Sequence, residues 1–176
     1  MIKDPTHPRT VLRYCQKCGK EVQFDSQNFK SVCDHCGFQF YINSAAAVAA
    51  VIESDNGQVL FAVRGREPFI GMLDLPGGFI DVGETAENAL MREINEELGA
   101  NVTSSSYLGS FPNEYSYGGL TYYTLDLAYR CKVESLDNLK AQDDISGWEF
   151  HNLKEMDLEL IGSTSMKNIV RFLQNE

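Results

Sequence analysis

The sequence predicts an α/β protein of the α+β kind, in which a small metal-binding domain precedes a larger domain of strands and helices. Two cysteine pairs lie near the N-terminus, strand-like apolar and alternating runs follow, and two later segments have helical periodicity. A chain of 176 residues is long enough for one ordinary domain and a small appendage. We expect the small domain over residues 1–42 and the larger one over residues 43–176.

The overall composition excludes several classes of function. A net charge of −10 argues against broad binding to nucleic acid or to anionic membranes. No apolar run reaches the roughly 18 to 20 residues that span a bilayer, and the first residues lack the apolar segment of a secretory signal. We therefore expect a soluble, cytoplasmic protein.

The first element is a pair of CxxCG motifs, in which fourteen residues separate Cys18 from Cys33. Two residues between thiolates let one turn present both sulfurs to one ion, which predicts a closed tetrahedral site. Its ligands would be Cys15, Cys18, Cys33 and Cys36. Zinc ribbons and rubredoxin-type iron sites both resemble this pattern; zinc is favoured, in a structural role, because four thiolates leave no open position.

The larger domain is expected to begin with a buried strand over Ala45–Ile52, a run of small and β-branched residues. Asp55-Asn56-Gly57 is a hairpin signal, and Val59–Val63 is the return strand. Arg64 and Arg66 follow that strand. Either arginine is a candidate contact for a phosphate, and the alternative is that both are ordinary surface residues.

The next element is a helix predicted over Ala86–Leu98, with Thr85 as N-cap and Gly99 at its C-terminal end. At about 100° per residue, one arc of this helix is apolar and the adjacent arc is acidic. The apolar arc consists of Leu90, Met91, Ile94 and Leu98. The acidic arc consists of Glu93, Glu96 and Glu97.

Carboxylates crowded on one face repel one another, so this arc favours a bound cation. Hard oxygen ligands suit Mg²⁺ or Mn²⁺, and Mg²⁺ commonly bridges a protein to substrate phosphates. Arg92, one turn before Glu96, is placed to orient a glutamate. The alternative interpretation is a solvated acidic helix face, which is what most charge runs are.

The spacing of the whole segment decides between these interpretations. Residues 78–100 read GFIDVGETAENALMREINEELGA. The order Gly78, five residues, Glu84, seven residues, Arg92-Glu93-Ile94, one residue, Glu96-Glu97, one residue and Gly99 resembles the signature of the Nudix hydrolase family. Only Ala100 departs from it, because the family usually has a bulkier aliphatic residue there.

The resemblance implies a Nudix α/β/α sandwich with a mixed sheet. It also implies hydrolysis of the pyrophosphate bond of a nucleoside diphosphate linked to another group. The helix glutamates and the backbone carbonyl of Gly78 would hold one to three Mg²⁺ ions, and Glu93 or a loop carboxylate would deprotonate the attacking water.

After the helix we expect a strand over Val102–Leu108, a loop over Gly109–Leu120 and a long strand over Thr121–Val133. Tyr115 and Tyr117 in the loop are candidate platforms for stacking a nucleobase. The alternative, favoured for the tyrosines of the second long strand, is that they pack on the sheet.

The final elements are a short strand over Gly147–Phe150 and an amphipathic helix over Ser165–Gln174. Asp143 and Asp144 precede the strand, in a segment that resembles the late acidic segment of Nudix proteins. There a carboxylate acts as base or outer metal ligand, and Asp144 is the candidate here.

A ribbon followed by this signature also resembles NADH pyrophosphatases, but their later Ser-Gln-Pro-Trp-Pro-Phe-Pro motif is represented only by Phe111-Pro112. ADP-ribose and dinucleotides therefore stay open as substrates. A second class of function is a catalytically weak sensing or partner-binding module, against which the intact carboxylates weigh. Isomerase motifs for isoprenyl diphosphates are not evident. The Nudix fold is often dimeric, so the resemblance leaves a homodimer open as the assembly.

Overall fold

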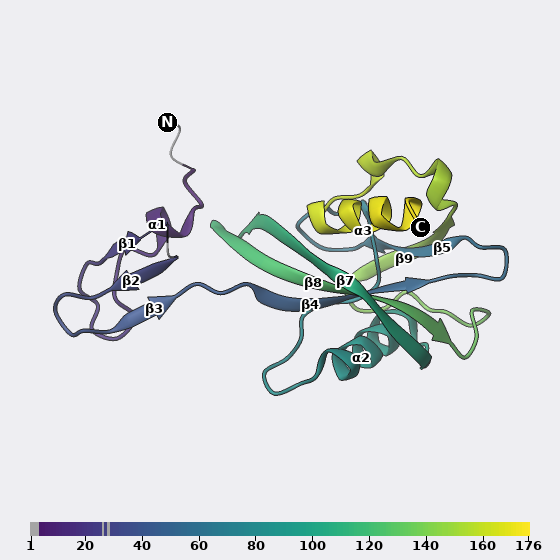
Figure 1. Cartoon of the computed structure of the whole chain (residues 1–176), viewed down its shortest axis with the longest axis horizontal. Helices are drawn as coiled ribbons and strands as arrows, with labels where there is room; N and C mark the ends of the chain where they lie inside the picture. Colours follow the sequence, from purple (N-terminus) through teal and green to yellow (C-terminus); the bar gives the residue numbers. More distant parts are fainter. Residues whose placement is uncertain (1–3, 26, 28) are drawn as a thin grey trace. The chain divides into compact units, whose positions relative to one another are not determined.

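The computed structural model describes residues 4–25, 27 and 29–176. Contacts divide the chain into two compact units (Figure 1). The first comprises Met1–Ser44 and Glu114–Tyr123, and the second comprises Ala45–Asn113 and Thr124–Glu176. The domain boundary expected after residue 42 stays a prediction.

The first unit contains a short helix and a small antiparallel sheet. The helix α1 (Pro8–Val11) has Pro8 in its first turn, and the His7 side chain accepts a hydrogen bond from the Arg9 N–H. The sheet has the order β1–β2–β3. Its strands are β1 (Gln23–Asp25), β2 (Lys30–Val32) and β3 (Gln39–Tyr41).

The tip of a long hairpin belongs to the same unit. This hairpin joins β7 (Val102–Tyr117) to β8 (Leu120–Val133) through Gly118 and Gly119, whose φ angles are 57° and 81°. The prediction of a loop over Gly109–Leu120 is therefore wrong. Residues 111–115 alternate between half-buried and exposed, as a strand requires, and two residues with positive φ are enough for a tight hairpin turn.

Contacts that are distant in sequence hold this hairpin tip to the N-terminal segment. The Thr121 N–H donates to the Thr6 carbonyl at 2.8 Å. The Thr6 hydroxyl lies 3.0 Å from the Ser116 hydroxyl and 2.8 Å from that of Thr121. Phe29 packs edge-on against Tyr123 with ring centroids 5.2 Å apart. The hairpin tip and the cysteine-bearing segment thus form one packed body.

The second unit has two three-stranded sheets, of order β4–β8–β7 and β6–β5–β9. Pairing is mixed, because β4 runs parallel to β8 whereas β5 is antiparallel to both of its neighbours. The strands not yet bounded are β4 (Ala45–Ile52), β5 (Val59–Arg64), β6 (Leu73–Asp74) and β9 (Ile145–His151). The helices are α2 (Ala86–Leu98), η1 (Leu153–Glu155), η2 (Leu158–Leu160) and α3 (Thr164–Gln174).

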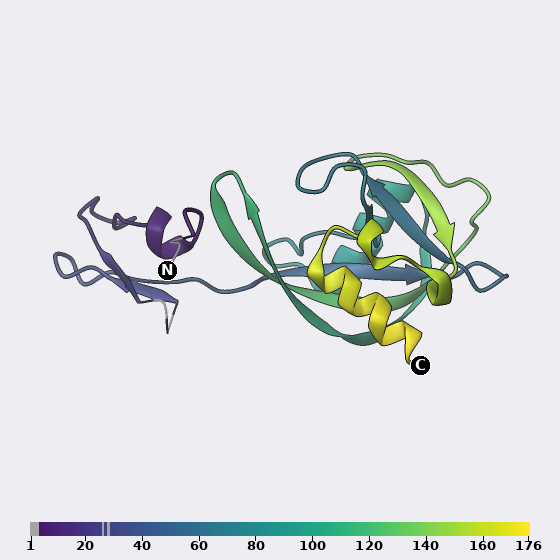
Figure 2. The same cartoon turned by 90° about the horizontal axis from the view of Figure 1, so that it is seen from above.

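Strand β4 is buried on both faces, which explains its continuous apolar sequence. Val48, Ala50 and Ile52 pack in the cluster that includes α2, whereas Ala49 and Val51 pack in the cluster that includes α3. The two helices accordingly cover opposite faces of the strands (Figures 1 and 2). The predicted α/β/α sandwich with mixed pairing is confirmed.

Two local expectations need correction. The Asp55–Gly57 turn forms, with Gly57 at φ 79°, but β4 and β5 share only the bridge between Glu53 and Val59, since each strand pairs in a different sheet. Met91 was expected on the apolar arc of α2 and is 45% exposed, because it lies at the margin of the buried face. The closing helix packs as predicted. Among the described residues, no helix is both long enough and apolar enough to cross a membrane.

Candidate active site

Helix α2 has the termini that its sequence predicts. The Thr85 hydroxyl accepts a hydrogen bond from the Asn88 N–H at 3.2 Å, and Gly99 ends the helix in the left-handed conformation at φ 66°. Leu90, Ile94 and Leu98 are fully buried. Burial of this face fixes the rotation of the helix and with it the directions of the acidic side chains.

The three acidic residues of α2 differ in exposure. Glu97 is buried, with 6% of its surface exposed, and the Glu93 side chain is 12% exposed, whereas the Glu96 side chain is 45% exposed. A buried carboxylate is costly unless a charge or a hydrogen bond compensates it. The partners of Glu93 and Glu97 are therefore the central feature of the site.

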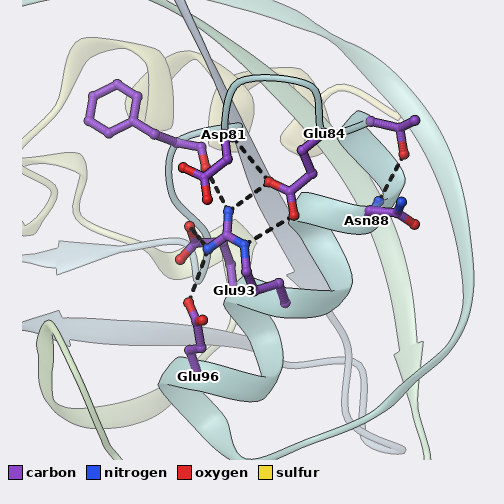
Figure 3. Close-up of polar contacts among 8 residues, drawn as sticks. Asp81, Glu84, Asn88, Glu93 and Glu96 are labelled. Atoms are coloured by element: carbon purple, nitrogen blue, oxygen red, sulfur yellow. Dashed lines mark hydrogen bonds and ion pairs between the residues drawn. The ribbon is translucent and has the colours of Figure 1, made fainter.

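Arg92 connects three of the carboxylates. Its Nε and Nη2 atoms donate to the two oxygens of Glu84 at 3.1 and 2.9 Å. Its Nη1 atom donates to Glu93 at 2.7 Å and to Glu96 at 3.0 Å, and Nη2 also reaches the Phe79 carbonyl. Figure 3 shows Glu84 converging from the loop with Glu93 and Glu96 from the helix. One guanidinium thus bonds to three carboxylates, and its role in orienting them stays a prediction.

The glycine loop before the helix contacts Glu97 and closely approaches Glu93. The Gly77 N–H donates to Glu97 Oε2 at 3.0 Å. A Cβ atom at Gly78 would lie 2.6 Å from the Glu93 carboxyl group. The Gly78 carbonyl accepts a hydrogen bond from the Val48 N–H at 2.9 Å, which fastens the loop to β4. Gly78 leaves space for the Glu93 carboxylate, and Gly77 is needed for a different reason, because a Cβ atom there would collide with the Val48 backbone.

The electrostatics of the site favour a cation. Burial raises the pKa of Glu97 to about 8, although the Gly77 N–H opposes this effect. The charges of Asp74, Glu93 and Asp144 raise it further. Burial likewise raises the pKa of Glu93 against the opposing effect of Arg92. A divalent cation would supply the charge that these carboxylates lack, and their oxygens are the ligands that Mg²⁺ prefers.

Two predicted residues outside the helix have protein partners. Asp144 is exposed and forms an ion pair with Arg66 at 2.6 Å. It belongs to the same compact unit as α2, and its charge acts on Glu97. Arg64 pairs with Asp74 at 2.7 Å, with 28% of its side chain exposed. Its guanidinium is therefore already engaged by a carboxylate.

Tyr115 and Tyr117 belong to the first compact unit, whereas the glutamates belong to the second. Tyr115 stacks on Tyr122 with ring centroids 5.9 Å apart and an interplanar angle of 22°. Tyr117 is 53% exposed. Their role in binding a nucleobase stays a prediction.

The four paired cysteines come together as expected. Their sulfur atoms all lie within 4.8 Å of one another, with Cys15 and Cys36 at 3.7 Å and Cys18 and Cys33 at 3.6 Å. Sulfurs of a tetrahedral zinc site with bonds of about 2.3 Å would be separated by about 3.8 Å. The cluster therefore fits one zinc ion. Cys131 is buried in the other unit, and burial raises its pKa to about 12.

Comparison with known proteins agrees with this geometry. The NUDIX domain family matches residues 43–173, which include every element of the acidic site. The chain belongs to the Nudix family. An ADP-ribose pyrophosphatase of Methanocaldococcus jannaschii is 36% identical over 121 residues, covering 68% of each chain.

Other Nudix proteins resemble parts of the chain. An NAD-capped RNA hydrolase NudC of Haemophilus influenzae is 32% identical over 63% of this chain, and the match covers only 44% of that protein. The crystal structure of a Nudix hydrolase from Nitrosomonas europaea superposes with a TM-score of 0.64 over 92% of this chain and 88% of the other, at 23% identity. The latter likeness supports the Nudix fold alone.

Sequence reasoning missed Asp74, which lies between Leu73 and Leu75 in an apolar stretch. A carboxylate between two leucines is a signal of a buried ion pair. It also missed the Gly77 N–H as the partner of Glu97, because a backbone donor has no sequence signature.

Proposed function

We propose that the chain hydrolyses the pyrophosphate bond of a nucleoside diphosphate linked to another group, with Mg²⁺ or Mn²⁺ as cofactor. The observation that carries this proposal is the convergence of Glu93 and Glu97 with the glycine loop at Gly77 and Gly78. An acidic protein can bind an anionic pyrophosphate only where cations separate the charges. The helix carboxylates have the hard oxygen donors that this role requires.

The proposed role of each residue follows from its contacts. Glu93, Glu96 and Glu97, with the Gly78 carbonyl, would hold the metal, and Arg92 would keep Glu84, Glu93 and Glu96 oriented. The bound metal would neutralise charge on the pyrophosphate and lower the pKa of the attacking water. The proton of that water would pass to Glu93 or Asp144, and the variants Glu93→Gln and Asp144→Asn separate these two candidates. The base is the one whose loss removes the acidic limb of the pH profile of kcat.

ADP-ribose is the first substrate to test, because a relative that matches over 68% of each chain is named an ADP-ribose pyrophosphatase. The experiment is a panel of ADP-ribose, NADH, diadenosine polyphosphates, nucleotide sugars and nucleoside triphosphates, with Mg²⁺ or Mn²⁺ and a coupled phosphatase. Preference for one diphosphate-linked nucleoside supports the proposal. Absence of hydrolysis by folded, metal-bound protein contradicts it.

We also propose that the cysteine cluster holds a structural zinc ion. Burial acts to raise the pKa of Cys15, but backbone N–H groups of Cys18 and Lys17 lower it to about 7, whereas the neighbouring thiols help to raise the pKa of Cys18 to about 12. A bound zinc ion would favour the thiolate at both positions. Gly19 and Gly37, at φ 69° and 70°, complete two equivalent turns. Metal analysis of the purified protein tests this directly: about one zinc per chain is expected, and iron in its place contradicts it.

A further inference from the structure

Arg64 is held by protein acceptors on two sides. Its Nε atom donates to the Pro68 carbonyl at 2.6 Å, and its Nη1 atom donates to Asp74 Oδ2 at 2.7 Å. The Arg64 backbone also exchanges hydrogen bonds with Met72 and Gly71. The side chain therefore spans the base of the 65–72 loop.

Asp74, the last residue of strand β6, connects Arg64 to this strand. Its second oxygen, Oδ1, accepts the Leu75 N–H at 3.0 Å, and its side chain is only 15% exposed. Burial raises the pKa of Asp74, Arg64 opposes that effect, and the charge of Asp126 adds to it. Arg64 is thus the cation that compensates a carboxylate in an acidic interior, and the pair fixes the residue at which β6 ends.

The chain then reaches the active site within three residues. The Ala50 N–H donates to the Pro76 carbonyl at 2.8 Å, so the segment is fastened to β4 as it leaves Asp74. The next residue is Gly77, whose N–H binds Glu97. A Cβ atom at Gly77 would lie 2.1 Å from the Val48 carbonyl oxygen, so the segment has no freedom on that side.

We propose that Arg64, acting through Asp74, is a positioning residue that fixes residues 73–77 so that the Gly77 N–H holds Glu97 in the metal site. This inference rests on the proposed function for its catalytic consequence, but its geometric content concerns Glu97 alone. It differs from the phosphate contact that the sequence suggested for Arg64, and the two roles predict different kinetics.

The first test compares Arg64→Met with the wild-type chain in kcat, KM and Mn²⁺ affinity by calorimetry. Loss of a residue that orients a metal ligand typically costs about 10-fold to 100-fold in metal affinity or activity. We expect Mn²⁺ affinity and kcat to fall by that factor while KM changes by less than about threefold, because a residue that acts through Asp74 would leave substrate binding nearly unchanged. A raised KM with unchanged kcat and Mn²⁺ affinity would mean that Arg64 binds phosphate, and would overturn the proposal.

Further variants separate positioning from charge compensation. Arg64→Met together with Asp74→Leu removes both charges of this ion pair, so stability should recover relative to the single variant while Mn²⁺ affinity stays low. Recovery of Mn²⁺ affinity with stability would show that the pair only balances charge, which overturns the proposal. Arg64→Lys should restore part of the affinity, since it retains the charge and loses the planar fork. Arg171→Met is the control, because Arg171 is exposed on α3 and its side chain, among the described residues, donates to Asn168 alone.

Amide hydrogen exchange at Gly77 provides a readout that needs neither substrate nor metal. Faster exchange is expected in Arg64→Met and wild-type exchange in Arg171→Met; unchanged exchange in both overturns the proposal. If the wild-type chain hydrolyses nothing in the substrate panel, the proposed function fails. The exchange and Mn²⁺ measurements still decide the role of Arg64 in that case.

Discussion

Replacing Gly78 with alanine tests how tightly the glycine loop and helix α2 are fitted. A Cβ atom there would lie 2.6 Å from the Glu93 carboxyl group, whereas ordinary contact begins at 3.4 Å. The carboxylate would have to withdraw by about 0.8 Å. A displacement of about 1 Å at a reacting group can cost about 100-fold in rate. We therefore expect kcat for Gly78→Ala to fall by roughly two orders of magnitude.

The fold should survive this change, because the obstructing atoms are the end of a flexible side chain. Stability is expected to change by less than about 1 kcal/mol, measured by urea denaturation beside initial rates with Mg²⁺. Gly147→Ala is the matched control, since the nearest atom to its Cβ would be Val63 at 3.9 Å. Gly77→Ala should instead destabilise the fold, because its Cβ meets backbone. Wild-type turnover by Gly78→Ala would refute the reasoning.

Three further perturbations follow from the contacts described above. Arg92→Lys loses the planar fork that joins Glu84, Glu93 and Glu96, and steady-state kinetics should give a kcat about 10-fold to 100-fold lower; an unchanged kcat would contradict this. Cys18→Ser should release the hairpin tip, so limited proteolysis should cut near Gly118 in this variant and not in wild type; equal protection would mean that the metal does not support the tip. Burial raises the pKa of Asp126 above 3.8 in the native state. Between the pKa of the unfolded state and the higher pKa of the native state, the native state keeps a proton that the unfolded state has released. Wild-type stability therefore falls as pH rises through this interval. Asp126→Asn should therefore gain stability relative to wild type between acidic and neutral pH in urea denaturation, and a constant difference would refute the shift.

The parts of the structure that the sequence predicted depend on local rules. Helix α2 begins after Thr85 and ends at Gly99 as its capping residues require, and Glu93 and Glu97 share an edge because helical spacing puts them there. The CxxCG turns are equally local. Such features need no knowledge of what packs against them.

The errors concern features that tertiary structure decides. The segment from Gly109 to Tyr117 contains glycine, proline and polar residues, yet it is a strand because β8 pairs with it and because Pro112 lies in an edge strand that tolerates a missing donor. The Arg64 side chain could not be assigned to Asp74 from sequence, since the turn between β5 and β6 brings the two together. Long-range pairing of this kind leaves no periodic signal.

The most direct test of the metal-dependent mechanism is to follow ADP-ribose by ³¹P NMR with wild type and with Glu97→Gln, with and without Mg²⁺. Wild type with Mg²⁺ should convert the pyrophosphate signals into phosphate monoester signals. The variant should be slower by orders of magnitude while its circular dichroism is unchanged, because Glu97 is a proposed metal ligand. Equal rates for the two proteins, or conversion by wild type without any divalent metal, would contradict the role assigned to the acidic face of helix α2.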